Sequence, residues 1–198
     1  MALAATPYGL RPFNMIGGSP YNGGAIRQVP MTVNEASGIG FGDVVLIGAA
    51  SAGQPTAAAA TPVAGTTGGV LGVCVGCSFI DPTLKQQQYA NAVPANAVTG
   101  GYKNIQVFVN DDPRQLYTLQ SAGTAADILI GKFCALGAFG AANVYGNSPV
   151  NGLTPANTAT LAMRIVGFNS PAADGFRDLI VKFNSGVLMW DNTIVLAN

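Results

Sequence analysis

Apolar and polar residues alternate over several short stretches of the chain. In 105–109, Ile105, Val107 and Val109 take every second position. This period of two is typical of a β-strand with one buried face, because successive side chains point to opposite sides of a sheet. The same alternation or a β-rich composition predicts further strands at 26–33, 115–120, 160–166 and 179–183.

Other stretches depart from strict alternation. Val44–Ile47 and Val70–Ile80 are apolar throughout, which favours buried strands. The polar stretch Lys85–Asn91 shows no repeat of 3.6 residues and is interpreted as a strand at the surface. Thr124–Ile130 is the best candidate for a helix, with a capping Thr at its start and Gly131 at its end.

Turn and loop signals separate these segments. Asn110–Pro113 is a strong turn signal, and Pro30 predicts an edge strand or a bulge. The stretch 48–69 is almost wholly Ala, Gly, Thr, Pro and Ser, which predicts an exposed loop or hairpin. A second loop, 138–155, is rich in Gly, Asn and Pro, and the tail 187–196 is apolar again. Many short strands between such turns predict a mainly β fold, an antiparallel barrel or sandwich with long Gly/Ala-rich loops.

The first 24 residues differ from the rest. Pro and Gly are too frequent here for a regular helix, yet the segment is too apolar for a solvated disordered tail. We therefore expect residues 1–24 to form an extended N-terminal arm on a β-rich body of residues 25–198. The candidate interface residues of this arm are Tyr8, Leu10, Arg11, Phe13, Ile16 and Tyr21. Two interpretations stay open: the arm packs on its own body, or it reaches a neighbouring subunit.

The amino-acid composition indicates that the chain is one subunit of an assembly. Charged residues make up 9% of the 198 residues and give a formal net charge of zero, whereas 49% are apolar. Ordinary soluble domains carry about 25% charged residues, and a surface poor in charge favours association. We expect a homo-oligomer; a monomer coated in Ser, Thr, Asn and Gln is the alternative.

Nucleic acid and membrane are not indicated as partners. The nine Lys and Arg form no basic run of the kind that binds nucleic acid. The apolar stretches are broken by Gly and Cys and fall short of the about 20 residues that a membrane span needs. The N-terminus lacks a positive region followed by an apolar one, so we interpret it as a mature cytoplasmic N-terminus and not as a signal peptide.

Residues suited to catalysis are scarce. The chain has no His, which excludes the common nucleophile–base triad. Asp111 and Asp112 are the only adjacent acidic pair; we favour a role in the turn over acid–base chemistry or the binding of a hard cation. Gly65–Gly69 and Gly38–Gly42 lack the context of nucleotide-binding loops and predict tight turns. We therefore expect no enzyme, no cofactor and no metal.

The three cysteines are Cys74, Cys77 and Cys134. A zinc site needs about four Cys and His ligands. The Cys74–Cys77 pair stands inside an apolar run, whereas a thioredoxin-like motif opens a helix after a strand. We interpret all three as small buried apolar residues.

Several short segments share a pattern with a known family. They are Ala5–Pro12 (Ala-Thr-Pro-Tyr-Gly-Leu-Arg-Pro), Ile16–Gly18, Phe41–Val45, Gly76–Pro82, Val109–Pro113, Arg164–Val166 and Ile180–Asn184. On these segments the chain resembles a group of small virion proteins of tailed bacteriophages, the capsid decoration or cement proteins. The similarity runs over most of the chain and is weakest in the 48–68 and 135–158 loops.

The resemblance implies a β-rich protein bound as trimers outside a shell of major capsid protein, with no cofactor and no catalysis. It implies a place on the capsid exterior of the virion, after synthesis in the bacterial host cytoplasm. Such a protein stabilises the shell by mass action, because it binds only the assembled state.

Two alternatives stay open. One is another virion component, such as a minor or major capsid protein or a tail protein. The other is a carbohydrate-binding adhesion β-sandwich, which calls for exposed aromatic residues on a platform.

Overall fold

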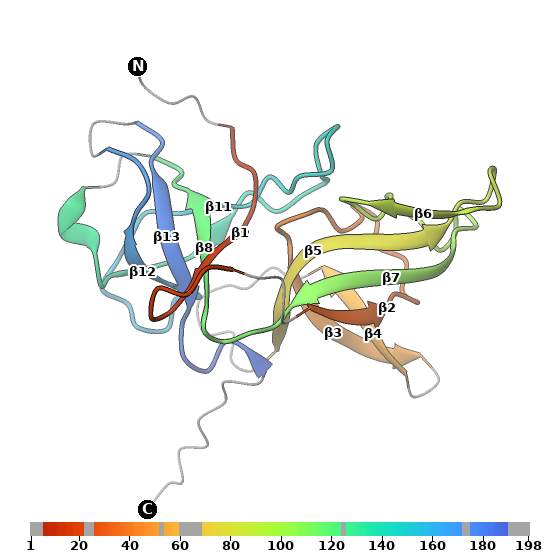
Figure 1. Ribbon diagram of the computed structural model, residues 1–198, viewed down its shortest axis with the longest axis horizontal. Coiled ribbons are helices and arrows are strands. Elements are labelled where there is room, and N and C mark those ends of the chain that lie inside the picture. Colours follow the sequence, from red (N-terminus) through yellow and green to blue (C-terminus); the bar gives the residue numbers. More distant parts are fainter. Residues whose placement is uncertain are drawn as a thin grey trace, which may run out of the picture.

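The structure, a computed structural model, describes residues 6–21, 26–51, 54–59, 69–123, 126–171 and 175–189. Within these ranges the protein is mainly β, as the sequence predicts. Its antiparallel sheets pack in a sandwich-like arrangement without closing into a barrel (Figure 1). Of the two predicted architectures, the sandwich is therefore the one observed.

The first sheet brings together strands from both ends of the chain. Its order is β1 (Arg11–Met15), β8 (Gln115–Gln120), β13 (Asp178–Phe183), β12 (Met163–Phe168) and β9 (Phe133–Cys134). All four pairings are antiparallel. A short additional pair is formed by β10 (Leu136–Gly137) and β11 (Asn151–Gly152).

The second sheet is built mostly from the first half of the chain. Its order is β2 (Ile26–Pro30), β7 (Lys103–Asn110), β5 (Val70–Ile80), β3 (Val44–Ser51) and β4 (Gln54–Ala59), and β6 (Gln87–Ala90) pairs with β5 as well. The sheet curls, so that β3 and β4 lie beneath β5 and β7 (Figure 1).

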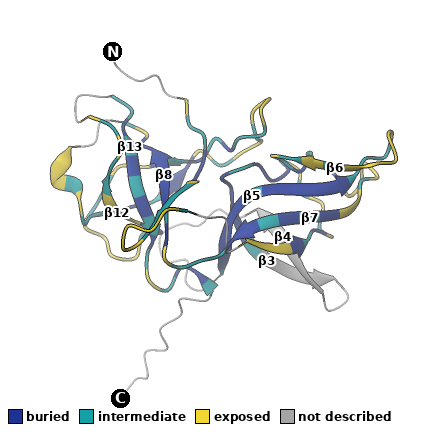
Figure 2. Cartoon of the chain, viewed as in Figure 1, coloured by how far each residue is buried: buried dark blue, intermediate teal, exposed yellow. Residues whose placement is uncertain are grey.

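Two clusters of buried residues form the core. The first joins the sheets, because Val44 and Val73 of the second sheet pack in the same cluster as Leu119 and Val181 of the first. The second cluster lies within the curl of the second sheet and includes Leu71. Figure 2 shows β5 buried along most of its length, and strands of both sheets contribute buried residues.

Several predicted strands are confirmed. The apolar run Val70–Ile80 is β5, and the polar stretch expected at the surface contains β6. Pro30 ends β2, which pairs only with β7 and is an edge strand, where a missing N–H is tolerated. The stretch 48–69 contributes to the β3–β4 hairpin, and its residues 52, 53 and 60–68 lie outside the described ranges.

The helix predicted at Thr124–Ile130 is wrong. The described part of this stretch forms one 3₁₀ turn, η1 (Asp127–Leu129), flanked by extended residues. Thr124 itself lies outside the described residues. Gly131 follows at φ +86°, which stops the segment, and a helix this short gains too few hydrogen bonds to form. No helix in the described ranges is long and apolar enough to cross a membrane.

Candidate interaction surface

The described part of the N-terminal arm, residues 6–21, packs on the chain's own body. β1 pairs with β8, with Arg11 opposite Thr118. Leu10 is fully buried in the first core cluster, and its N–H donates to the carbonyl oxygen of Gly42 at 3.0 Å. Of the two interpretations left open for the arm, these residues follow the one in which it packs on its own body.

Tyr8 is anchored in the same way. Its hydroxyl donates to Asp178 Oδ1 at 2.7 Å, and the guanidinium of Arg11 lies 4.9 Å from its ring centroid. Burial, followed by the bond to the Asp178 carboxylate, raises the pKa of Tyr8 well above its usual value. Tyr8 therefore fastens the arm to β13 as a neutral phenol.

The other four candidate residues keep some solvent contact. Ile16 is 45% exposed beyond the end of β1, and Phe13 is half-buried. Arg11 and Tyr21 line one open groove of about 400 Å³, together with Phe41 from the turn before β3. The structure thus brings Arg11 and Tyr21 together and leaves only part of the candidate set accessible to a neighbour.

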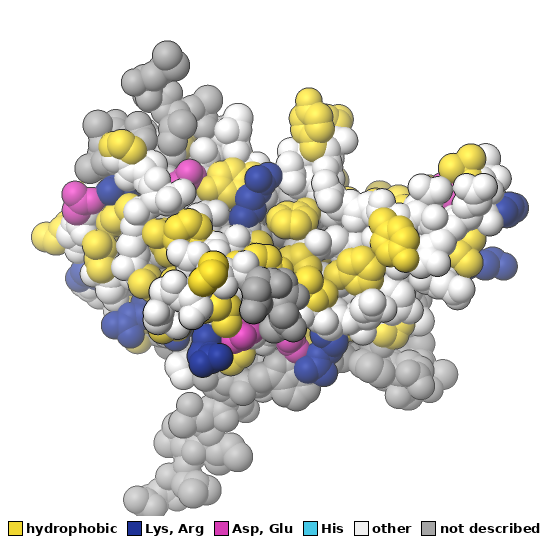
Figure 3. Space-filling model, viewed as in Figure 1, with side chains coloured by type: hydrophobic (Ala, Val, Ile, Leu, Met, Phe, Trp, Pro, Cys, Tyr) yellow, Lys and Arg dark blue, Asp and Glu magenta, His cyan; other side chains and the backbone are white. Residues whose placement is uncertain are grey.

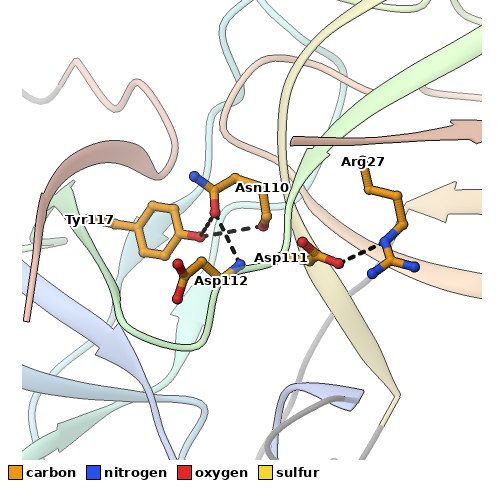
Figure 4. A network of polar contacts seen from close by, with 5 residues as sticks. All are labelled: Arg27, Asn110, Asp111, Asp112 and Tyr117. Carbon is orange, nitrogen blue, oxygen red and sulfur yellow. Dashed lines mark hydrogen bonds and ion pairs between the residues drawn. The ribbon is translucent and has the colours of Figure 1, made fainter. Parts of the chain in front are cut away.

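The acidic pair belongs to the turn that carries the chain from the second sheet to the first (Figure 4). The Asp112 carboxylate accepts the N–H of Arg114 at 2.8 Å, and Asp112 N–H donates to Asn110 Oδ1 at 3.2 Å. Asp111 pairs with Arg27 Nε of β2 at 2.8 Å. This confirms the predicted turn role for Asp112, whereas the Asp111 side chain joins the turn to β2 by an ion pair. Among the described residues, no group of three or more His, Cys, Asp or Glu is arranged to hold a metal ion.

A buried polar pair fixes the turn before β3. Asp43 accepts hydrogen bonds from the Ser148 hydroxyl and from Gly40 N–H. Burial raises the pKa of Asp43, and these two hydrogen bonds oppose that shift. Ser148 Oγ also accepts the N–H of Val150 at 3.1 Å. The pair therefore ties the Gly38–Gly42 turn to the loop before β11.

The cysteines are buried thiols, as predicted. Cys74 and Cys77 lie in the second core cluster and Cys134 in the first, and none forms a disulfide. Burial raises the pKa of Cys77 and of Cys134 to about 12. Thiols held neutral in this way are poor nucleophiles and poor metal ligands.

Two of the most exposed apolar residues in the described ranges stand on a hydrogen-bonded loop tip. Val144 and Tyr145 are 94% and 77% exposed. The Asn143 side chain accepts the N–H groups of Tyr145 and Asn147 at 2.9 and 3.1 Å, and Gly146 N–H donates to the Asn143 carbonyl. We name Val144 and Tyr145 the apolar tip.

The base of this loop is fixed as well. Phe41 N–H donates to the Gly146 carbonyl at 2.8 Å, and Ser148 N–H donates to the Phe41 carbonyl at 2.9 Å. Asn91 Nδ2 donates to the Tyr145 carbonyl at 3.3 Å. The apolar tip is thus presented in one backbone conformation, so a partner would not have to order it.

A second apolar projection lies at η1. Ile128 and Ile130 are 81% and 54% exposed. Asp127 binds Arg177 at 2.7 Å, and the Arg177 guanidinium lies over Phe168 at 3.6 Å. This buried Arg fastens the projection to the first sheet. Figure 2 shows η1 as an exposed segment at one end of the molecule.

Sequence reasoning missed both projections, because each lies in a stretch expected to be a loop or a helix. A usable signal exists for the apolar tip. Asn143 and Gly146 are typical first and last residues of a turn, and the two residues between them are apolar, where polar ones are the norm.

Comparison with protein-family models, curated proteins and solved structures finds no match to this chain.

Proposed function

We propose that the protein is a structural virion subunit that binds the outside of a phage capsid shell and stabilises it, as a decoration or cement protein does. The observation that carries the proposal is the apolar tip. Val144 and Tyr145 expose apolar surface on a backbone fixed by hydrogen bonds. Burial of such a surface by a partner lowers the free energy, by about 1.5–3 kcal/mol for a side chain of the size of Val.

The composition and the second projection support the same function. The chain carries few charges, and Ile128 adds an exposed apolar group on a segment tied down by an ion pair. The proposed partners are the major capsid protein of the same phage and further copies of this chain in a trimer. Catalysis, a cofactor, nucleic acid and a membrane have no part in this function.

Binding to capsids tests the proposal directly. Purified protein is added to heads that lack it, and the bound fraction is measured by co-sedimentation. We expect wild type to bind and the heads to resist heat better. The Val144→Ser, Tyr145→Ser double variant should bind about tenfold more weakly.

A matched control separates docking from a general loss of surface hydrophobicity. Leu84 is 61% exposed on the turn between β5 and β6, and Leu84→Ser should bind as wild type does. Failure of wild type to bind heads, or equal binding by the double variant, would contradict the proposal. Cryo-EM of the particle then separates a decoration site from a place in the shell or the tail.

The trimer has its own measurement. Sedimentation equilibrium of the free protein should give three times the mass of the chain. A well-behaved monomer at high concentration would contradict this part of the proposal.

A further inference from the structure

The outer face of the second sheet carries a hollow that neither residue of the apolar tip lines. Four strands line it: Gln28 comes from β2, Gln87 and Tyr89 from β6, Gln106 and Phe108 from β7, with β5 between them as its floor. Its volume is about 190 Å³. Over the middle of β5 and β7, Figure 3 shows hydrophobic side chains among uncharged ones, with the Lys and Arg side chains lying toward the ends of these strands.

The pleat of the strands gathers these side chains on one face. Ile105, Val107 and Val109 of β7 are buried in the core, so Gln106 and Phe108 point outward between them. Phe108 stands opposite Gln28 in the register. Gln106 and Tyr89 both stand opposite Ser78 of β5, one from each side.

Asn104 completes the lining through an irregularity in β7. The register between β5 and β7 shifts between Ser78 and Ile80, and Asn104 has φ +51°. Positive φ is uncommon for residues other than Gly, and Asn tolerates it better than most. Bulges re-aim side chains and recur beside functional sites. Here the irregularity brings Asn104 into the hollow.

Amide groups in the hollow are available to a ligand. The side chains of Gln28, Asn104 and Gln106 form no hydrogen bond with any other residue in the part of the chain that the structure describes. Each amide offers two N–H donors and a carbonyl acceptor. A hydroxyl is also both donor and acceptor, so several amides around one hollow match a ligand with several hydroxyls.

The aromatic residues add an apolar surface beside these amides. Tyr89 is 74% exposed, and its ring centroid lies 6.5 Å from that of Phe108 at an interplanar angle of 34°. None of the residues that line the hollow is Asp, Glu, Lys or Arg, which disfavours an ionic ligand. A ligand that presents C–H groups on one face and hydroxyls around its rim, without charge, is a sugar ring.

We propose that this hollow binds a neutral hexose unit of a glycan. The Tyr89 ring stacks on the C–H face of the sugar, and Gln28, Asn104 and Gln106 pair with its hydroxyls. The site does not depend on the proposed docking to a capsid, because no residue of the apolar tip lines the hollow.

Saturation-transfer difference NMR tests the site with neutral disaccharides of hexoses as probes: maltose, cellobiose and lactose. Wild type should transfer saturation to the ring protons of at least one of them at millimolar concentration. Tyr89→Ala and Gln106→Ala should each weaken that binding about tenfold. Tyr145→Ala removes an equally exposed Tyr elsewhere and should leave it unchanged.

Each other outcome overturns the site. Absence of transfer from wild type to every probe, unchanged binding by Tyr89→Ala, or preference for a sialylated analogue over its neutral parent contradicts it. Chemical unfolding checks that the variants are folded. Binding of Tyr89→Ala to capsid heads should equal that of wild type, so the glycan site and the docking surface fail independently.

Discussion

Gly9 and Gly42 meet backbone to backbone. A Cβ on Gly42 would lie 2.9 Å from Gly9 Cα and 2.8 Å from Leu10 N, and both glycines have positive φ, +76° and +87°. Gly42 N–H in turn donates to the Cys74 carbonyl of β5 at 2.8 Å. The contact therefore fixes the N-terminal segment, the turn before β3 and the central strand of the second sheet at one point.

We expect Gly42→Ala to lower the free energy of unfolding by about 2–5 kcal/mol, because it adds a steric clash to an unfavourable φ. Gly131→Ala is the control. Gly131 has nearly the same φ, +86°, but no atom within 4 Å of an added Cβ, so the strain alone should cost about 1–3 kcal/mol. Urea unfolding measures both, and equal losses would show that the backbone contact is unimportant.

The arm should be required for folding. Leu10→Ala should destabilise the protein by about 2–5 kcal/mol, because Leu10 is fully buried. Ile16→Ala, at a residue 45% exposed, should change stability by no more than about 0.5 kcal/mol. Deletion of residues 1–24 should abolish the cooperative unfolding transition. A truncated protein that unfolds cooperatively would show instead a detachable arm.

Asp43 should make stability depend on pH. Because burial raises its pKa, the folded protein binds this proton more tightly than the unfolded chain does. The stabilisation is complete below the ordinary carboxyl pKa and is lost as pH rises through the raised value. Relative to Asp43→Asn, wild type should therefore lose stability as pH rises through and above the ordinary carboxyl pKa. Urea unfolding across this range measures the difference, and an opposite slope would contradict the direction of the shift.

The three thiols should resist alkylation in the folded protein. All are buried, and the pKa of Cys77 and of Cys134 is raised to about 12, so the reactive thiolate is scarce near neutral pH. Iodoacetamide should add nothing to the native chain and three groups to the denatured one, as read by mass spectrometry. Rapid native labelling of Cys77 would mean that the inner face of β5 is open to solvent.

The strands could be predicted where burial alone determines the pattern of apolar residues. Ile105, Val107 and Val109 alternate because one face of β7 is buried, and Val70–Ile80 is apolar throughout because it runs through the core. The strand predicted at 160–166 lies instead at Met163–Phe168. Alternation sets which residues share a face, whereas pairing with β9 and β13 sets where the strand begins and ends.

The partners of each strand were not predictable in this way. The burial of Leu10 depends on β8 and on the close approach of two glycines, and neither is visible in local sequence. The apolar tip and the amide-lined hollow also depend on contacts that are not visible in local sequence. Gln28, Tyr89 and Gln106 are far apart in the chain. They meet only because β6 and β7 both pair with β5, and β2 pairs with β7 in the same sheet.

The pairing of β1 with β8 also limits when β1 can join its sheet during synthesis of the chain. Met15 stands opposite Gln115, so the first strand has no partner until all strands of the second sheet have been synthesised. At roughly 5–20 residues per second, that interval is on the order of 10 s. During this interval, the unpaired apolar N-terminal segment can pair with β8 of another copy of the chain. Exchange of β1 between nascent chains is therefore the misassembly to which this topology is most open.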